Sequence, residues 1–525
     1  MAGDESPDGT TCTRNTRHVV ETLIIGAGMS GVCMGVKLLE AGRTSFAVLE
    51  RSGSVGGTWR HNRYPGCRCD VPSYLYCFSF DRNPRWSHTF AERGEIESYV
   101  DEVSARRGVT AHIRFRTEVV SATWDETSCM WHVRAATSED NTKKESSWAA
   151  RFLVRATGNF GVPRYPGPLS GSVVRERFEG AWFHSSDWPA DADADVDTGL
   201  EMARDRAVAV VGTGASAVQI VPELARVAKK LYVCQRTPSW ILPHLADVSI
   251  PGPVRCLLAR VPALLSLVRW ALFIFIEFIL GLALWGGPVR PFVAALVTSC
   301  ATRHLRRSVA DPSLRAALLP SYELGCKRVL FSNTFYPCLT LAHVELLQGS
   351  LVQVLPRSIV VSHPTLSHPR RHVDVDVIVY ATGFDIWSPC FPIVGRHNAT
   401  LASTTPSFLG ITSHGFPNFF MLLGPNTGVG HTSQILMIEA QARYIISCMR
   451  LLEPPARALE LRASTQKRFE DFFVKQFPHT VWHNGGCNSW YINPSTSKVG
   501  AIWPSSTLEY MYRTRFASRK DYDFR

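Results

Sequence analysis

Short runs of apolar residues, each ending in a glycine-rich turn and followed by a helix-like stretch, occur twice along this chain. The first run is 23–25 before the turn 26–31, and the second is 208–211 before the turn 212–217. A short apolar run bounded by glycines is typical of a buried strand in a parallel sheet. Both turns also follow the spacing G-x-G-x-x-G/A, which sets a helix N-terminus against a dinucleotide pyrophosphate. The pattern therefore predicts two Rossmann-like α/β units.

Two further strand ends predict how these units are connected. Alternating apolar and polar positions at 111–155 predict a β-meander, and its last strand, 151–155, runs into the triplet Ala-Thr-Gly at 156–158. The strand 375–380 runs into the same triplet at 381–383. Because the second glycine turn lies between the triplets, we expect the chain to cross between the units at each of them. The predicted fold class is α/β, with two Rossmann-like dinucleotide-binding domains, the second inserted into the first, and an added helical subdomain.

The predicted domain boundaries follow from these crossings. The first dinucleotide-binding domain is expected at 19–160 and 386–518, the second at 161–242 and 323–385, and the helical subdomain at 243–322. The charged tail 519–525 is predicted to be loose.

The segment 256–300 is long, apolar and helix-like, and Glu277 is the one ionisable residue within 270–285. Hydropathy allows a membrane span, because ten Leu, Ile and Phe residues at about −0.3 to −0.6 kcal/mol each outweigh one central acid that costs about 3 kcal/mol. A single span would, however, place the two parts of the second domain on opposite sides of the membrane. We therefore expect the apolar segment 261–285 to be buried in the helical subdomain, with peripheral association at a membrane surface as the alternative.

Composition narrows the class of protein. With 525 residues, 45% hydrophobic and 19% charged, the chain is typical of an ordered globular protein. The net charge is +11, but the densest basic run, 303–307, has no interleaved aromatic residues, so we expect no nucleic-acid partner. The 14 cysteines show neither metal-ligand nor disulfide spacing, which predicts no metal site and a reducing, cytoplasmic location. The polar stretch 1–17 lacks the apolar core of a secretory signal.

The residue that ends the next strand of each unit distinguishes the two nucleotides. Glu50 follows the apolar run 46–49, whereas Arg236 stands at the same place after 231–234. A carboxylate accepts hydrogen bonds from a free ribose diol, as in FAD or NAD, while an arginine suits the 2′-phosphate of NADPH. The residues predicted to bind the first nucleotide are Gly26, Gly28, Gly31 and Glu50, and those predicted to bind NADPH are Gly212, Thr213, Gly214, Ser216, Ala217 and Arg236.

Three further stretches resemble a known family. They are 56–70, with Gly57, Trp59 and Asp70; 178–189, with Phe178, Gly180, His184 and Trp188; and 325–328, which reads Gly-Cys-Lys-Arg. Together they closely resemble the class B flavoprotein monooxygenases, specifically the type I Baeyer–Villiger monooxygenases. The family's short fingerprint, F-x-G-x-x-x-H-x-x-x-W followed by Pro or Asp, is complete, and Trp188 stands where the sister family that oxygenates nitrogen and sulfur carries Tyr or Phe.

The resemblance implies roles for individual residues. Arg328 matches the family's catalytic arginine, which stabilises an anionic oxygen nucleophile and then the oxyanion formed on the ketone, and Asp70 matches the carboxylate that orients it. Gly57, Thr58, Trp59 and Asp70 are expected at FAD, and Lys327, Arg328 and Thr237 at NADPH beside Arg236. His184 is expected to be a structural and hinge residue. Trp490 lies in a C-terminal segment that, by resemblance, closes over NADP⁺ and substrate.

The implied reaction uses FAD, NADPH and O₂ to insert one oxygen atom beside the carbonyl of a ketone, giving an ester or lactone. The apolar segment points to a lipophilic substrate. The sequence as a whole is similar to fungal enzymes of secondary metabolism. Two alternatives stay open, which are oxygenation of nitrogen or sulfur and a non-oxygenating flavin reductase or oxidase. A third, a lipid- or nucleic-acid-binding protein with vestigial loops, conflicts with the intact glycine turns.

Overall fold

The computed structural model describes residues 17–525 except 140–141, 168, 190–196, 245–246, 286 and 364–369. Most of the polar N-terminal stretch that bears on a secretory signal therefore lies outside the described residues, as does Cys12.

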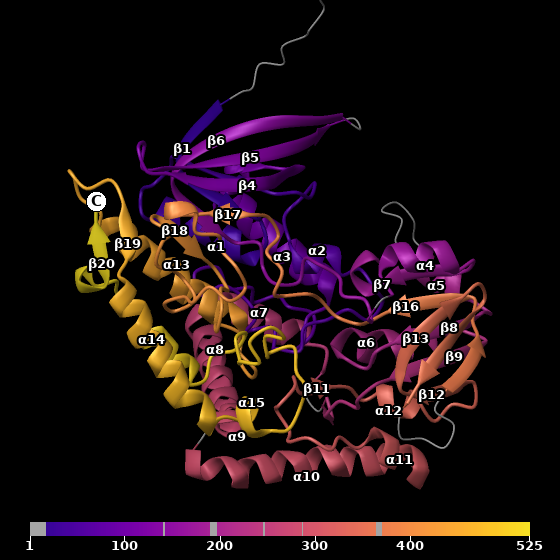
Figure 1. The fold of residues 1–525 in the computed structure, drawn as a ribbon. Helices are drawn as coiled ribbons and strands as arrows, with labels where there is room; N and C mark the ends of the chain where they lie inside the picture. Colours follow the sequence, from indigo (N-terminus) through magenta and orange to yellow (C-terminus); the bar gives the residue numbers. More distant parts are fainter. Residues whose placement is uncertain are drawn as a thin grey trace, which may run out of the picture.

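The first sheet holds the first glycine turn and has eight strands in the order β17-β4-β5-β6-β1-β2-β3, with β18 also paired to β6. The strands are β1 (Arg17–Ile25), β2 (Phe46–Leu49), β3 (Ile113–Arg114), β4 (Thr117–Asp125), β5 (Met130–Glu139), β6 (Thr142–Arg155), β17 (Ile393–Val394) and β18 (Phe419–Met421). Strand β1 is parallel to both β2 and β6, whereas β4, β5 and β6 are antiparallel, so the predicted meander is confirmed. Helices α1 (Met29–Glu40) and α13 (Gln434–Leu451) pack together beside this sheet (Figure 1).

The second sheet holds the second glycine turn and is parallel throughout, in the order β12-β9-β8-β16-β7. Its strands are β7 (Ala181–His184), β8 (Ala207–Val211), β9 (Lys230–Gln235), β12 (Val344–Gln348) and β16 (Val377–Tyr380). The helices around it are α4 (Gly171–Arg177), α5 (Thr198–Ala203), α6 (Ala215–Leu224) and α12 (Phe335–Cys338). A separate antiparallel sheet is formed by β13 (Ser350–Leu355), β14 (Ser358–Ser362) and β15 (Arg370–Asp374).

The two Ala-Thr-Gly triplets lie where the chain leaves one sheet for the other. All strands of the second sheet fall between β6 and β17, and β17 and β18 return to the first sheet. At the first triplet a Cβ on Gly26, whose φ is +103°, would lie 2.7 Å from the carbonyl oxygen of Ala156; at the second a Cβ on Gly212, with φ +114°, would lie 2.5 Å from that of Ala381. Each triplet therefore lies so close to the first glycine of its turn that no larger residue fits there. The predicted fold class, with one α/β unit inserted into the other, is confirmed.

A helical layer is inserted between β10 (Ile241–Leu242) and β11 (Leu330–Phe331), which pair in parallel and so bring its two ends together. It comprises α7 (Gly252–Arg260), α8 (Pro262–Ile276), a π-helical turn (Glu277–Gly281), α9 (Leu282–Trp285), α10 (Arg290–Ser308) and α11 (Pro312–Leu318). Figure 1 shows α10 crossing one end of the α8–α9 helix at the margin of the molecule.

The prediction that the apolar segment 261–285 is buried is only half correct. One face of α8, with Leu265, Phe273 and Ile276, joins the core beneath the first sheet. The opposite face is exposed together with parts of α7 and α10, and its large apolar residues are Val254, Leu257, Val261, Leu267, Trp270, Ile274, Phe275, Phe278, Ile279, Val289, Phe292 and Leu296. Among the described residues, Pro262–Trp285 is long and apolar enough to cross a membrane, and 39% of its most apolar window is buried against the protein. A soluble protein's core helix passes the same test, so length and composition alone do not decide the point.

The prediction of a loose C-terminal tail is wrong. Strand β20 (Tyr522–Phe524) pairs with β19 (Leu459–Leu461), and Tyr522 is fully buried. Its hydroxyl shares a hydrogen bond with that of Tyr444 at 2.9 Å. Backbone pairing and one buried aromatic ring thus outweigh the tail's exposed charges. The other C-terminal helices are α14 (Ala463–Gln476), α15 (Val481–Asn484) and α16 (Thr507–Arg513).

Candidate active site

Arg328 and Asp70 form a bidentate ion pair between loops that are far apart in the sequence. Nε of Arg328 donates to Oδ2 of Asp70 at 2.6 Å, and Nη2 donates to Oδ1 at 2.6 Å. This geometry fixes the plane of the guanidinium and uses two of its five N–H donors. Both side chains keep about a third of their surface exposed, at 31% and 27%. The structure therefore presents an oriented, partly open cation.

The pair also fixes the charge of both groups. Burial alone would raise the pKa of the Asp70 carboxyl, but the Arg328 guanidinium holds that pKa below its usual range. Burial would lower the pKa of Arg328, and Asp70 raises it instead. Both groups are therefore ionised at neutral pH, and Arg328 cannot give up its proton there.

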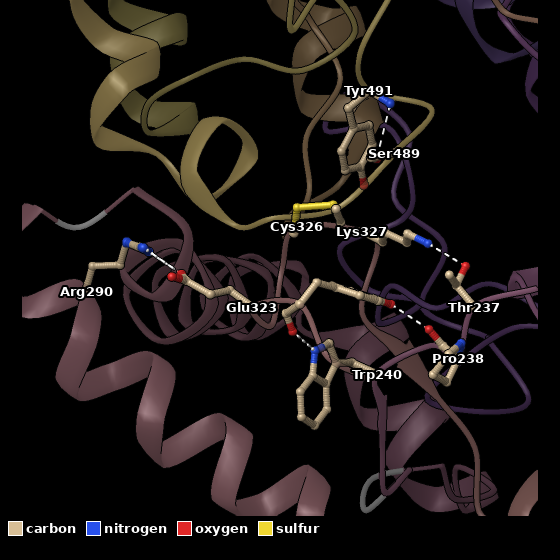
Figure 2. The surroundings of a disulfide bond; sticks show 11 residues. Thr237, Pro238, Trp240, Arg290, Glu323, Cys326, Lys327, Ser489 and Tyr491 are labelled. Atoms are coloured by element: carbon tan, nitrogen blue, oxygen red, sulfur yellow. Dashed lines mark hydrogen bonds and ion pairs between the residues drawn. A yellow bond between two sulfur atoms is a disulfide. The ribbon is translucent and has the colours of Figure 1, made fainter. Parts of the chain in front are cut away.

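Tyr491, which the sequence analysis did not single out, is buried beside this pair. Burial raises the pKa of Tyr491 to about 12, and the positive charge of Arg328 opposes that rise. Its backbone N–H donates to Oγ of Ser489 at 3.2 Å, and Figure 2 shows its ring above the corner that carries Cys326 and Lys327. Its place directly after Trp490 is the signal that could have found it.

The first glycine turn forms a bare backbone cradle at the N-terminus of α1. A Cβ on Gly57 would lie 3.0 Å from Cα of Gly28, so the two glycine loops face each other without side chains between them. Glu50 is buried, and its carboxylate accepts the N–H of Ala27 at 2.7 Å and that of Ser52 at 2.8 Å. These bonds hold the carboxylate against the turn and leave lone pairs for a ribose diol. Bare backbone, helix N-terminus and carboxylate together fit FAD.

Two further residues predicted at FAD, Thr58 and Trp59, directly follow Gly57. Thr58 begins the short helix α2 (Thr58–His61). The indole N–H of Trp59 donates to the hydroxyl of Tyr76 at 3.1 Å, which orients its ring.

Arg155 is a further candidate at the same edge that the sequence analysis missed. It pairs in register with Ile25, immediately before the first glycine turn. Its buried Nε has no hydrogen-bond partner among the described residues, and the side chain lines a cavity between the two crossings that also touches Asn159, Trp387 and Gly424. A cation at the end of the strand before the triplet was the available signal.

The second glycine turn opens toward solvent at the N-terminus of α6. A Cβ on Gly214 would meet no atom within 4 Å, so a ligand can approach the backbone there. Thr213 donates to the carbonyl of Thr237 at 3.1 Å, and Ser216 lies in the first turn of α6. Ala217 is fully buried where α6 packs on the sheet.

Arg236 and Lys327 form a pair of cations beside this turn. Nζ of Lys327 donates to Oγ1 of Thr237 at 2.8 Å, and Arg236 is exposed. Burial, and then the charge of Arg236, lower the pKa of Lys327. Because an anion between two such cations would relieve their repulsion, the residues present fit the 2′-phosphate of NADPH.

The fingerprint residues contact the second sheet and its crossing rather than the Arg328–Asp70 pair. A Cβ on Gly180 would lie 2.3 Å from the carbonyl oxygen of Asp376 and 2.7 Å from the ring of Phe178, which explains the glycine. The indole N–H of Trp188 donates to Asp197 at 2.8 Å, and its ring packs on Gly199.

His184 is neutral and connects β7 to the second crossing by hydrogen bonds. The N–H of Ser186 donates to Nδ1 at 3.1 Å, so Nε2 carries the proton and donates to the carbonyl of Gly383 at 3.0 Å. Burial lowers the pKa of His184 to about 4. The ring also meets Phe384, which contacts Phe160, which in turn contacts Trp490. Aromatic contacts thus connect the fingerprint to the C-terminal segment.

A disulfide joins Cys326, the residue before Lys327, to Cys487 in the C-terminal segment (Figure 2). The two cysteines are 161 residues apart, with their Cα atoms 6.1 Å apart. The sequence shows no disulfide spacing, because a bond made by tertiary folding leaves no local pattern. Cys67 and Cys69 are buried thiols, and burial raises the pKa of Cys67 to about 11. No group of three or more His, Cys, Asp or Glu residues in the described ranges is arranged to hold a metal ion.

Comparisons with known proteins agree with this geometry. A family model described as "Flavin-binding monooxygenase-like" matches residues 20–269. A Baeyer–Villiger monooxygenase of Pseudomonas aeruginosa is 35% identical over 507 residues, covering 95% of this chain and 90% of that protein. One of Streptomyces coelicolor is 36% identical over 511 residues, covering 96% and 92%. The crystal structure of OTEMO in complex with FAD and NADP has a TM-score of 0.79 at 26% identity and covers 96% of this chain and 99% of that one. The chain therefore belongs to the flavin-binding monooxygenase-like family and, within it, to the FAD- and NADPH-dependent Baeyer–Villiger monooxygenases.

Proposed function

We propose that this monooxygenase inserts one oxygen atom of O₂ beside the carbonyl of a lipophilic ketone, giving an ester or lactone, and that Arg328 is its catalytic residue. The observation that carries the proposal is the partly open guanidinium of Arg328, held in plane by Asp70 and kept charged by it. Bound FAD, once reduced by NADPH, supplies the activated oxygen. The ketone is electrophilic at carbon, so the attacking oxygen must be a nucleophile and is most reactive as an anion.

Arg328 performs two tasks in this proposal. Its free N–H donors stabilise the anionic oxygen nucleophile, and they then stabilise the oxyanion that develops on the ketone when the carbonyl carbon is attacked. A guanidinium suits both tasks because it stays protonated in a dry site. Asp70 keeps the guanidinium plane fixed, so no reorganisation is needed when the charge moves to the substrate.

The nucleotide contacts belong to the same proposal. The residues 19–160 and 386–518 would form the FAD-binding domain, with Gly26, Gly28, Gly31, Glu50, Gly57, Thr58 and Trp59 at the cofactor. The residues 161–242 and 323–385 would form the NADPH-binding domain, with the second glycine turn under the pyrophosphate. Arg236, Thr237 and Lys327 would grip the 2′-phosphate, supported by the mutual repulsion of the two cations.

The variants Arg328→Ala and Arg328→Lys test the catalytic role. Purified enzyme is incubated with NADPH, air and a panel of cyclic and long-chain ketones, with methyl phenyl sulfide as an added substrate, and products are identified by mass spectrometry. We expect wild type to form esters and Arg328→Ala to form them at least about 100-fold more slowly, while NADPH still bleaches the FAD absorbance of both proteins. Arg328→Lys keeps the charge but loses the planar fork, so we expect an intermediate rate.

Other outcomes identify the two alternatives. Ester formation by Arg328→Ala at the wild-type rate would remove Arg328 from the reaction. Formation of sulfoxide but no ester by wild type would show a heteroatom oxygenase. Stoichiometric hydrogen peroxide with no oxygenated product would show a reductase or oxidase.

The exposed apolar face of the helical layer supports a working position at an anionic membrane surface. The segment 248–310 contains seven arginines and one acidic residue, Glu277, which is buried against His431. Arg260, Arg303, Arg306 and Arg307 are exposed on the same helices as the apolar face. Apolar residues among arginines, with no exposed acid, suit insertion among anionic headgroups. Because β10 and β11 bring both ends of the layer together, the helix would lie in the interface rather than cross it.

Co-sedimentation with vesicles tests this association. We expect the enzyme to bind phosphatidylcholine vesicles that contain 30% phosphatidylserine, and to bind pure phosphatidylcholine weakly. The double variant Phe275→Ser/Phe292→Ser removes rings that are 63% and 79% exposed and should lose most of the binding. Phe516→Ser removes a 69% exposed ring outside this face and serves as the matched control. Equal binding by all three proteins would overturn the association.

Eleven free thiols among the described residues support a cytoplasmic location for such an enzyme.

A further inference from the structure

The disulfide Cys326–Cys487 lies directly against the proposed active site. Cys326 is followed by Lys327 and Arg328, and Cys487 precedes Ser489, Trp490 and Tyr491. Figure 2 shows the sulfur–sulfur bond beneath Tyr491 and next to the Lys327–Thr237 hydrogen bond. The cross-link thus connects the residues that carry two active-site cations to the segment that covers them.

The backbone on the Cys326 side is firmly packed. The N–H of Cys326 donates to the carbonyl of Glu323 at 3.1 Å, and Cys326 is buried in a core cluster with Trp240 and Tyr322. Gly325 has φ +92°, and a Cβ there would lie 2.2 Å from a methyl group of Leu284 in α9. We therefore take this side, the corner 323–328, as the fixed partner of the disulfide.

On the Cys487 side, exposed and buried residues alternate. Gly486, Asn488 and Trp490 are exposed, whereas Ser489 and Tyr491 between them are buried. The carbonyl of Gly485 accepts the N–H of Glu323 at 3.0 Å, and a Cβ on Gly485 would lie 2.8 Å from that of Cys326. The exposed residues of the segment open at low free-energy cost, and Tyr491 and Cys487 contact the core cluster that holds Cys326. The cross-link therefore adds to the contacts that fix the segment 486–491.

The surrounding cysteines indicate that this bond has a functional role. Eleven described cysteines remain free, among them the exposed Cys256, Cys300 and Cys390. One bond among so many thiols is unlike the disulfide framework of a secreted scaffold, and isolated disulfides in reducing compartments are generally catalytic or redox-responsive.

We propose that Cys326 and Cys487 are positioning residues of the oxygenation reaction. Their disulfide holds the segment 486–491, with Tyr491, over the Lys327–Arg328 corner and excludes water from it. Reduction releases the segment, admits water, and diverts electrons from NADPH into hydrogen peroxide instead of product. This inference rests on the proposed function, because it assigns the two cysteines an effect on the partition of that reaction.

The redox steps balance with simple co-reactants. A dithiol opens the bond by thiol–disulfide exchange, giving up two electrons and two protons to the cysteine sulfurs and becoming a disulfide itself. A peroxide closes it again: the more accessible Cys487 thiolate attacks one peroxide oxygen and releases hydroxide, and the Cys326 thiolate then displaces the oxygen from the resulting sulfenic acid. For hydrogen peroxide, the two hydroxides take up the two protons lost by the cysteine thiols, so the products are the disulfide and two molecules of water. The hydrogen peroxide released by an uncoupled enzyme would therefore restore its own closed state.

The first test follows the position of the segment and does not depend on turnover. Holoenzyme purified without reductant is alkylated, digested and mapped by mass spectrometry before and after treatment with dithiothreitol. Hydrogen exchange of the peptide that contains 486–491 is then measured in both states. We expect a Cys326–Cys487 peptide before reduction and at least tenfold faster exchange after it. Two alkylated cysteines in untreated enzyme, or equal exchange in the two states, would overturn the proposal.

The second test measures the rate at which hydrogen peroxide is released from NADPH and air, without ketone, for three proteins. Wild type and Cys300→Ser should both show at least a threefold rise in the rate of peroxide release on reduction, reversed by reoxidation. Cys487→Ser, which changes the half-buried partner, should show the high rate from the start and not respond to dithiothreitol. A lower Tm for Cys487→Ser with an unchanged peroxide rate would show a purely structural bond and overturn the proposal. If wild type consumes no NADPH at all, the proposed function fails. The hydrogen-exchange measurement then still shows whether the disulfide fixes the segment 486–491.

Discussion

The two glycine turns are built on the same plan and differ where their sequences differ. In both, the first glycine has a positive φ and lies against the carbonyl of an Ala-Thr-Gly triplet. In the first turn, however, a Cβ on Gly31 would lie 1.8 Å from the carbonyl oxygen of Gly26, whereas the second turn carries Ala217 at the same place and buries it. The strands that follow end in the buried Glu50 and the exposed Arg236. Backbone contacts thus fix the shared frame, and single side chains adapt each frame to its nucleotide.

The largest effect is expected from Gly31→Ala. The new methyl group cannot coexist with the Gly26 carbonyl, so α1 must move away from the turn and the pyrophosphate cradle must widen. We expect the purified variant to lack FAD and all oxygenase activity. FAD released by heat and measured by fluorescence checks this, and Gly94→Ala, in the first turn of a helix where a Cβ would meet no atom within 4 Å, reports the effect of an uncrowded alanine. Full FAD content in Gly31→Ala would show that the first turn tolerates an alanine as the second does.

The next effect concerns how each crossing is held. The second crossing relies on His184, whose Nε2 donates to Gly383, while at the first crossing the amide of Asn159 donates to the carbonyl of Leu423 at 3.2 Å. Only the histidine titrates. Its pKa is about 4 in the folded protein and about 6.5 when unfolded, so the unfolded state binds the proton first as pH falls. The free energy of unfolding should therefore fall between about pH 6.5 and pH 4, by at most about 3 kcal/mol.

His184→Gln should remove that part of the pH dependence. Denaturant unfolding of wild type and variant at pH 7.5, 6.0 and 5.0 measures it, with Asn159→Ala as the variant that weakens the other crossing. We expect the difference in stability between wild type and His184→Gln to shrink as pH falls. A constant difference would mean that His184 does not titrate as its burial implies.

The two glycine turns and the crossings between the sheets could be predicted from the sequence because each depends on a local pattern. Glycine spacing, apolar runs and the repeated triplet identify both turns and the crossing points, since each depends on residues adjacent in the chain. The pairing of Asp70 with Arg328, across 258 positions, was available only by resemblance. Tyr491, Arg155 and the Cys326–Cys487 bond were missed because tertiary folding alone brings them together. The exposed face of α8 was missed for a related reason: an all-apolar helix does not reveal which side finds a partner.

A smaller effect is expected at the second nucleotide site. Arg236→Ala removes one of two cations, and a charge-assisted hydrogen bond contributes about 1.5–3 kcal/mol, so KM for NADPH should rise about 10- to 100-fold. The KM for NADH should stay within about twofold because NADH has no 2′-phosphate. Steady-state oxidation of both coenzymes measures the ratio, and Arg226→Ala, on an exposed residue that pairs with Glu223, is the control. An equal rise for NADH and NADPH would contradict the assignment of Arg236 to the phosphate.

The smallest effect is expected from Ala217→Gly, the reverse of the first change. Ala217 is buried in the first turn of α6, and its methyl group packs on the second sheet without crowding the backbone. Glycine there creates no clash and costs about 1 kcal/mol of helix propensity. We expect a Tm lower by about 1 °C for a chain of this size and a KM for NADPH within twofold of wild type. Loss of NADPH binding would show that the Ala217 methyl group is needed to bind the nucleotide. The two turns would then differ in how they bind a nucleotide as well as in how closely their backbones pack.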